Sequence, residues 1–310
     1  MELIQVDARE FANVLPAQGN IYSSVPFTEL NRHKCREVAY LLFRDTRLRG
    51  GLVTGLRDGI WRSPFSAPFG GLVLSRTQRV EEVEEMYSLA IEFACKGADG
   101  LRVTLPPEFM DAALYAKSVN VLTRFSGGCG VPEINYHVDL RGIVDPVSLY
   151  SRSAREKLRQ AQRLPFRFEQ LEVAPDNIAR VYDVIHQNRM HRGFPHNMTL
   201  AEVTATASVV PMDLFMLTLD GEPAAAAQVH HIAPGVVQVV YWGDMPGMSA
   251  ARPMNLLPLE IYRHYLSRGD IDFIDIGHST EDGQPNYGLC EYKESVGCRA
   301  SIKWSFEIHP

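Results

Sequence analysis

Positive charge is concentrated between Arg152 and Arg167, in a chain that is otherwise acidic. This stretch holds six basic residues and one acid, whereas the 310-residue chain has 31 Lys and Arg against 37 Asp and Glu, a net charge of −6. On a helix, Arg155 and Arg159 share a face because residues four apart are neighbours. Such a face can bind phosphate groups or the end of an RNA, and it can equally be a solvated helix surface.

A second group of reactive side chains lies in the loop Gly277–Gly288, which follows the buried-type strand Ile271–Ile276. Amine acylation needs a base for the proton of the nucleophile, donors for the developing oxyanion and an acid for the leaving group. The loop and the residues after it supply these types: His278, Glu281, Asp282, Asn286, Tyr287, Tyr292, Lys293 and Glu294. Ligands of open α/β sheets bind outside the strand ends, although the segment can also be an ordinary polar loop.

The stretch Trp242–Asn255 (WGDMPGMSAARPMN) is a third candidate. It connects a predicted strand with a helix opened by Pro253, and a helix N-terminus attracts anions through its free N–H groups and its dipole. Arg252 can add a bidentate contact to a phosphate. Neither a Walker-type lysine nor G-x-G-x-x-G is present, which argues against nucleoside triphosphates and dinucleotides. A plain connecting loop is the alternative.

The sequence offers little support for metal chemistry or a catalytic nucleophile. His186, His191 and His196 recur at five-residue steps, which differ from the i,i+4 spacing of zinc ligands. His230 and His231 are adjacent in a predicted strand and therefore point to opposite faces. No G-x-S-x-G elbow occurs. We therefore predict no metal site.

Composition and length limit the class of protein. Hydrophobic residues make up 45% and charged residues 22%, which is ordinary globular usage, and the length corresponds to about two domains. No apolar run reaches the roughly 18 residues that span a bilayer, and the N-terminus has no signal-peptide pattern. The acidic balance argues against DNA binding. Five cysteines without C-x-x-C spacing predict reduced thiols in a cytoplasmic protein.

The first half alternates strand-like and helical segments. A long helix begins near Val80 and stops at Gly97, and Pro106 opens another that ends near Ser118. Strands are predicted at Val38–Arg44, Gly51–Leu56, Leu101–Leu105, Val119–Phe125 and Glu133–Leu140.

The second half begins with helices and continues with strands. Strands flank the turn Asp220-Gly221, which is a strong hairpin signal. Pro258 should end or kink the helix that starts at Pro253, unless a neighbour compensates. The crossover from Val236 to Ile276 requires parallel neighbours. The predicted helices are Asp145 to about Arg163, Asp176–Arg192 and one capped by Thr199 and Glu202. Both halves show the same order of elements, which predicts two similar units.

The order of several segments is more specific than any one of them. SRSAREKLRQAQR, VYDVIHQNRMHRGFP, LFMLTLDGEPAAAAQVHH, YWGDMPGMSAARPMNLL, GDIDFIDIG and GLCEYKESVG follow one another in the second half. Together they resemble the Fem-type (FemABX-like) acyltransferases of the GNAT superfamily, with their S-x-x-x-R-x-x-L/I-R-x-A helix, D-G-x-x-A-A turn and closing F-K-x-x-F/V-G segment. The resemblance covers residues 146–308, and the first half fits by element order and by the loop SPFSAPFGG. The GNAT pyrophosphate loop Q/R-x-x-G-x-G/A is absent.

The resemblance implies a fold and a place for the site. The fold is α+β (mixed α/β), with two GNAT-like acyl-CoA N-acyltransferase domains of mixed, mainly antiparallel sheets flanked by helices, at residues 1–143 and 144–310. The second domain would carry the active site. By position in the family, Arg155, Arg159 and Lys293 would lie near the donor or a phosphorylated acceptor, and backbone amides near Ala226–Val229 would hold the acyl oxygen. From the residues themselves we add Arg252 and Asn255 as binding residues.

The predicted function is an N-acyltransferase that moves an acyl or aminoacyl group from a thioester or ester donor to an amine. Tyr287 or Tyr292 would protonate the leaving group, and Glu281 or His278 would help to deprotonate the amine. The co-substrate would be acyl-CoA or aminoacyl-tRNA, with no metal.

Two alternatives stay open. The first is a FemABX-type aminoacyl ligase of the cell wall, which uses aminoacyl-tRNA and a peptidoglycan-precursor amine; the heptad arm that such enzymes often carry for tRNA is missing here. The second is a degenerate GNAT pair that binds a ligand or partner without catalysis, which the missing pyrophosphate loop and the lack of one obvious base support.

Overall fold

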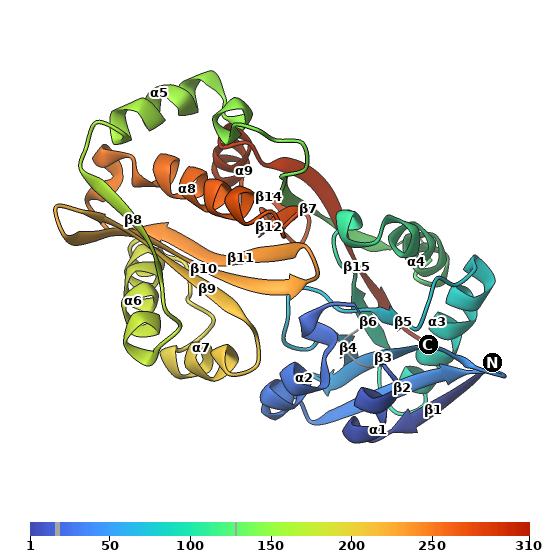
Figure 1. Ribbon diagram of the computed structural model, residues 1–310. Coiled ribbons are helices and arrows are strands. Elements are labelled where there is room, and N and C mark those ends of the chain that lie inside the picture. The colour runs from blue at the N-terminus through green and yellow to red at the C-terminus, as the bar shows by residue number, and fades with distance from the viewer. Residues whose placement is uncertain (16–18, 128) are drawn as a thin grey trace. The chain divides into compact units, whose positions relative to one another are not determined.

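The structure of the protein is a computed structural model that describes residues 1–15, 19–127 and 129–310. Its internal contacts divide the chain into two units (Figure 1). Unit 1 comprises Met1–Asn135, Thr280–Pro285 and Ser301–Pro310, and unit 2 comprises Tyr136–Ser279 and Asn286–Ala300. The chain thus returns to unit 1 twice after it has entered unit 2, so two segments of the C-terminal half make their contacts with the N-terminal unit.

Unit 1 is built on a sheet with the strand order β1-β2-β3-β4-β6-β15, and β5 pairs with β3. The neighbours are antiparallel except for the parallel pair β4 and β6. The strands are β1 Glu2–Val6, β2 Glu37–Arg44, β3 Leu48–Arg57, β4 Ile60–Ser63, β5 Leu72–Leu74, β6 Leu101–Thr104 and β15 Arg299–Ile308, with the small hairpin β13 Thr280–Glu281 and β14 Gln284–Pro285. The helices are α1 Ala8–Val14, α2 Val25–Asn31, α3 Val80–Cys95 and α4 Ala112–Phe125, with 3-10 turns at Ile21–Ser23, Arg32–Lys34 and Glu108–Met110.

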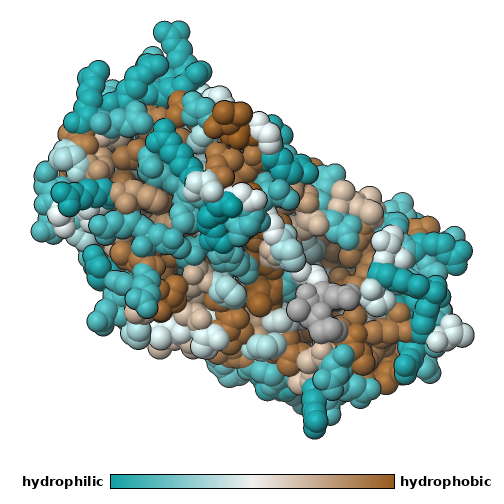
Figure 2. Space-filling model, viewed as in Figure 1, coloured by the Kyte–Doolittle hydropathy of each residue, from teal (hydrophilic) through white to brown (hydrophobic). Residues whose placement is uncertain are grey.

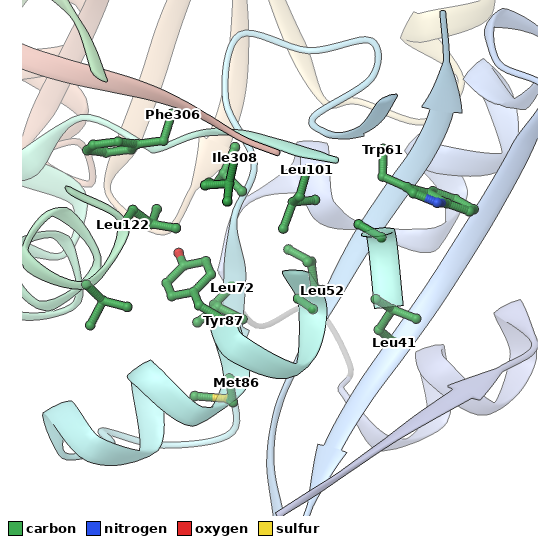
Figure 3. Packing of buried hydrophobic residues seen from close by; sticks show 14 of the residues in the cluster. Leu41, Leu52, Trp61, Leu72, Met86, Tyr87, Leu101, Leu122, Phe306 and Ile308 are labelled. Carbon is green, nitrogen blue, oxygen red and sulfur yellow. The ribbon is translucent and has the colours of Figure 1, made fainter. Parts of the chain in front are cut away.

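The core of unit 1 lies between this sheet and the helices α3 and α4 (Figure 3). Met86 and Tyr87 on α3 and Leu122 on α4 pack against strand residues such as Leu52 and Phe306. Each large apolar side chain that is fully buried contributes about 1.5–3 kcal/mol. The C-terminal strand is therefore part of the core of the N-terminal unit.

The predicted strand Val119–Phe125 is wrong, because these residues form the last turns of α4. Asp111 caps the helix by accepting a hydrogen bond from the Leu114 N–H at 2.9 Å. Val121 and Leu122 are fully buried on the face that packs in the core. The β-branched residues favour a strand locally, but tertiary packing against α3 outweighs that preference.

Unit 2 has the strand order β7-β12-β11-β10-β9-β8. Neighbours from β8 to β11 are antiparallel, and β11 and β12 are parallel. The strands are β7 Gly130–Asp139, which belongs to unit 2 from Tyr136 onward, β8 Phe166–Leu171, β9 Met212–Leu219, β10 Glu222–Ala233, β11 Val236–Asp244 and β12 Phe273–His278. The helices are α5 Arg152–Ala161, α6 Pro175–His191, α7 Leu200–Ala207, α8 Pro253–Arg268 and α9 Tyr287–Ser295, with 3-10 turns at Pro146–Leu149 and Met248–Ala251.

Helices cover both faces of the sheet in unit 2. Helices α6 and α7 lie on one face and α8 on the other, with α5 outside α8 (Figure 1). Ile178, Val181 and Ile185 of α6 recur at helical spacing and pack on β9 and β10. The predicted hairpin forms at Asp220-Gly221 between β9 and β10, and Thr199 caps α7 together with Glu202. Within the described ranges, no helix is both long and apolar enough to cross a membrane.

Candidate functional site in unit 2

Strands β11 and β12 run parallel but stay paired over a short distance. Their register joins three residue pairs and ends at Gln238 and Asp275, whose side chains are hydrogen bonded at 2.5 Å. β11 then continues to Asp244 and stays paired with β10 on its other side. Past Gln238, in the described part of the chain, no strand pairs with the β12-facing edge of β11. Free strand edges bind extended ligands through their peptide groups.

A bulge in β11 lies in this unpaired stretch. Val229 of β10 pairs with Val239, and Gln228 pairs with Tyr241, so Val240 is the extra residue. Bulges redirect backbone groups and are frequent beside active sites. The expectation that amides near Ala226–Val229 hold the acyl oxygen is wrong, because these residues pair with both β9 and β11. The free backbone lies one strand further, on β11.

Lys293 holds the end of β12. Its side chain is buried, and its Nζ donates hydrogen bonds to the main-chain oxygens of Ile276, Gly277 and His278 at 3.1, 2.8 and 3.0 Å. The ring of Tyr136 lies 5.4 Å from the same nitrogen. An ammonium group has three N–H donors, and three carbonyls that β11 does not reach accept them. Lys293 thus holds the end of β12 in place, and the expected binding of the donor or a phosphate by Lys293 stays a prediction.

The loop from β11 to α8 ends at Arg252, whose backbone is left-handed with φ 61°. The side chain is exposed. A non-glycine residue in this region costs of order 1–3 kcal/mol, and such strain clusters at ligand sites. Asn255 is buried, and its N–H donates to the Arg252 oxygen at 3.0 Å. The structure places both predicted residues at the start of α8, and ligand binding by them stays a prediction.

Asp244 organises a polar network that the sequence analysis missed. Its buried carboxylate accepts hydrogen bonds from Asn188 at 2.8 Å, from Arg192 at 3.1 Å and from Ser249 at 3.1 Å. Asn188 also donates to the Asp244 main-chain oxygen at 2.7 Å. Gly243 permits this approach, since a Cβ there would lie 2.6 Å from the Asn188 side chain. The network joins α6 to β11 and to the loop before α8. The sequence feature that could have pointed to this network is the Gly-Asp pair at the end of the strand.

Tyr292 lies beside this loop. Its ring meets Trp242 of β11 edge to face at 6.0 Å between centroids, and its hydroxyl donates to the main-chain oxygen of Met254 in α8 at 2.8 Å. Burial is the main cause that raises the pKa of Tyr292 well above its ordinary value. The phenol therefore stays protonated at neutral pH, and its role as an acid toward a leaving group stays a prediction.

The other predicted acid–base residues are exposed. His278 is the last residue of β12, and Tyr287 opens α9 with 79% of its surface exposed. Glu281 lies in the β13–β14 hairpin and belongs to unit 1 by its contacts. The structure thus gathers Arg252, Asn255 and Tyr292 at the start of α8 and leaves Tyr287 in solvent.

Helix α5 presents its basic residues to solvent. It buries Ala154, Leu158 and Ala161 and has an N-cap at Ser151. Arg155 and Arg159 are exposed, and neither forms an ion pair within the part of the chain that the structure describes. The surface over α5 is hydrophilic in Figure 2. The structure therefore shows a solvated basic face, available to an anionic partner.

No group of three or more His, Cys, Asp or Glu side chains is arranged to hold a metal ion in the residues that the structure describes.

Comparison with known proteins identifies the class. Residues 150–294 match the family model Acetyltransf_6, an acetyltransferase (GNAT) domain. No curated protein matches the chain. FemX is similar in structure, with a TM-score of 0.68 and 10% identity over 99% of this chain and 98% of that one. A tandem GNAT protein from the clavulanic acid biosynthesis pathway has a TM-score of 0.56 and 13% identity over 100% and 99%. L-PGS from Bacillus licheniformis has a TM-score of 0.58 and 11% identity over 98% and 92%.

The matched residues contain the separated strands, the Asp244 network and α8, so unit 2 carries a domain that matches the GNAT acetyltransferases. The predicted α+β fold with mixed, mainly antiparallel sheets flanked by helices is confirmed, and tandem GNAT proteins share it. Within this class, the resemblance to the Fem-type acyltransferases is also confirmed.

Proposed function

We propose that the chain is an N-acyltransferase that moves an acyl group from acyl-CoA to an amine, with the reaction in unit 2. The observation that carries the proposal is the separation of β11 from β12 after Gln238, in the stretch of β11 that leads through a loop to α8. A thioester donor with amide groups in its arm and phosphates at its far end matches a free strand edge followed by a helix N-terminus. Arg252 would contact the phosphates and Asn255 would support the first turn of α8.

The reaction forms a C–N bond and breaks a C–S bond. The amine attacks the thioester carbonyl, and backbone N–H groups near Val240 would stabilise the developing oxyanion. The thiolate then leaves, and Tyr292 would turn its single O–H from the Met254 carbonyl to the sulfur. Because the pKa of Tyr292 is far above the ~8.5 of a thiol, the phenol keeps its proton. The proton lost by the amine goes to a base, for which we propose His278 at the end of β12.

The acceptor would be a small-molecule amine or, by the Fem-type resemblance, the amine of a peptidoglycan precursor in cell-wall synthesis. Acyl-CoA and aminoacyl-tRNA are both made in the cytoplasm, which supports a cytoplasmic protein.

Thermal unfolding with acetyl-CoA, with CoA and without ligand tests the donor. A ligand at 100 times its Kd stabilises the folded state by ~2.7 kcal/mol, which corresponds to a shift of about 5 °C or more. Release of free thiol in the presence of primary amines then tests turnover. Absence of a shift at millimolar acetyl-CoA would refute the CoA donor, and a shift without turnover on any amine would favour the non-catalytic binder.

The exposed arginines of α5 favour a second candidate function, transfer from aminoacyl-tRNA. Arg155 and Arg159 would then contact the RNA backbone, and tRNA affinity would fall with salt. The double variant Arg155→Ala/Arg159→Ala should lower the slope of log K against log salt by about 2, whereas Arg152→Ala, whose arginine is paired with Glu156, should change it less. Equal slopes in both variants and the wild type would refute tRNA binding by α5.

A further inference from the structure

Four rings meet between α6, the α6–α7 connection and β11. His196 stacks on Tyr182 at 4.6 Å and meets Tyr241 edge to face at 4.7 Å, and His186 lies 5.5 Å from Tyr182 and 5.7 Å from His196. Tyr241 follows the bulged Val240 in the stretch of β11 that β12 does not reach. The cluster therefore touches the strand on which the acyl group would be held.

Three buried imidazole nitrogens in this cluster have no hydrogen-bond partner among the described residues. They are Nδ1 of His186 and both nitrogens of His196. A neutral imidazole has one N–H donor and one acceptor nitrogen, and nearly all buried polar atoms are paired in native proteins. Three such atoms side by side point to a polar group that is bound there during function.

The electrostatics of the cluster favour an uncharged ligand. Burial, followed by the nearby charge of Arg189 and by His186, lowers the pKa of His196 to about 4, so the ring is neutral at pH 7. Arg189 is fixed, since its Nε donates to the Pro195 oxygen at 2.7 Å and its guanidinium lies 5.3 Å from the ring centre of Tyr241. The same burial and positive charge disfavour an ammonium group and favour a free amine, which is the nucleophilic form.

We propose that His186 and His196, with the rings of Tyr182 and Tyr241, form the acceptor subsite and bind a primary amine as the free base through hydrogen bonds to the imidazole nitrogens. This inference rests on the proposed function and adds where the amine is held. His196 would be a binding residue rather than the base, because a ring with so weak a basicity does not hold a proton at pH 7.

The test follows the histidine nitrogens of the full chain by NMR while benzylamine is added, with and without acetyl-CoA. Benzylamine carries a primary amine and a ring that the tyrosines can contact. The signals of His186 and His196 should move and saturate, whereas that of His191, exposed at the end of α6, should not. Benzoate, which has the same ring and a carboxylate, should leave all three unmoved. Unmoved His186 and His196 signals at millimolar benzylamine, or equal effects of benzoate, would overturn the proposal.

A variant pair provides a second readout. His196→Phe keeps a ring for stacking and removes both nitrogens, so it should weaken benzylamine binding about tenfold or more while His191→Phe leaves it unchanged. Unchanged affinity in a folded His196→Phe protein would overturn the subsite. Acetyl-CoA binding, measured by calorimetry on the same samples, separates the two failures. Donor binding without amine binding refutes the subsite alone, and lack of donor binding refutes the proposed donor.

Discussion

The hydroxyl of Tyr292 donates a hydrogen bond to the main-chain oxygen of Met254, 2.8 Å away. This carbonyl would normally accept from the N–H four residues later in α8, but that residue is Pro258, which has no N–H. Pro258 does not end the helix, because α8 continues to Arg268. Tyr292 supplies the missing donor, so it has a structural role in addition to the proposed catalytic one.

The two roles of Tyr292 can be separated by restoring the helical donor. Tyr292→Phe should lower the free energy of unfolding by about 1 kcal/mol, since one hydrogen bond is lost, and should lower kcat about 10²-fold. Adding Pro258→Ala, which supplies an N–H for Met254, should recover stability but not kcat. Full recovery of turnover in the double variant would show that Tyr292 acts on stability alone. The exposed Tyr287 provides the control Tyr287→Phe, which should leave both quantities unchanged.

Lys293→Met should release the end of β12. Three carbonyls at the end of β12 lose their donor, so the free energy of unfolding should fall by about 2–3 kcal/mol. Amide exchange in Gly277 and His278 should quicken, and acetyl-CoA binding should weaken as the strand moves. Denaturant titration and hydrogen exchange measure these effects. Lys157→Met on the exposed face of α5 is the matched control, and equal stability of the two variants would contradict the positioning role.

Arg252→Gly should improve stability and weaken donor binding. Glycine adopts positive φ without strain, so the free energy of unfolding should rise by up to about 1 kcal/mol. Loss of the guanidinium should raise the Kd for acetyl-CoA roughly tenfold. Asp220→Gly relieves a similar left-handed residue, with φ 53°, in the β9–β10 turn and should leave the Kd alone. A Kd that does not change in Arg252→Gly would remove Arg252 from the donor site.

Asp213 should make the stability of unit 2 depend on pH. Its buried carboxylate accepts from His231 and Tyr265, each at 2.7 Å. Burial, the largest single cause, raises the pKa of Asp213, but the hydrogen bonds from His231 and Tyr265 together with the electrostatic attraction to His231 and Arg268 outweigh it, so the pKa is lowered. A carboxyl group whose pKa is lower in the folded than in the unfolded chain stabilises the fold at pH values above the unfolded pKa of ~3.9. This stabilisation is lost as the pH falls through the pKa of the folded state.

Asp213→Asn should therefore cost about 1–3 kcal/mol at pH 7, and the difference from wild type should shrink on acidification below pH ~4. Urea titrations across that range measure it, with the exposed Asp220→Asn as control. A difference that stays constant with pH would mean that the charge of Asp213 is not what stabilises the native state.

Local sequence patterns predicted most helices and strands, because a hairpin turn, a capping box or an amphipathic period depends on a few neighbouring residues. The strand prediction for Val119–Phe125 failed because α3, the helix against which these residues pack, lies far away in the sequence. The same limit applies to the site. Residue type, together with the family resemblance for Lys293, brought attention to Lys293 and Tyr292. Only the structure shows that Lys293 donates to the end of β12 and that Tyr292 replaces the donor missing at Pro258. The Asp244–Asn188 pair joins a strand to a helix of another segment and left no local pattern.

The last strand has a consequence for synthesis on the ribosome. β15 completes the sheet of unit 1 by pairing with β6, and the hydroxyls of Thr104 and Ser305, 201 positions apart, lie 2.8 Å from each other. While the nascent chain grows, β6 keeps an unpaired edge until residues 301–310 emerge, although domains usually fold in the order in which they are made. The unit that is translated first is thus completed last. A chaperone that shields strand edges would have to stay bound longest at the edge of β6.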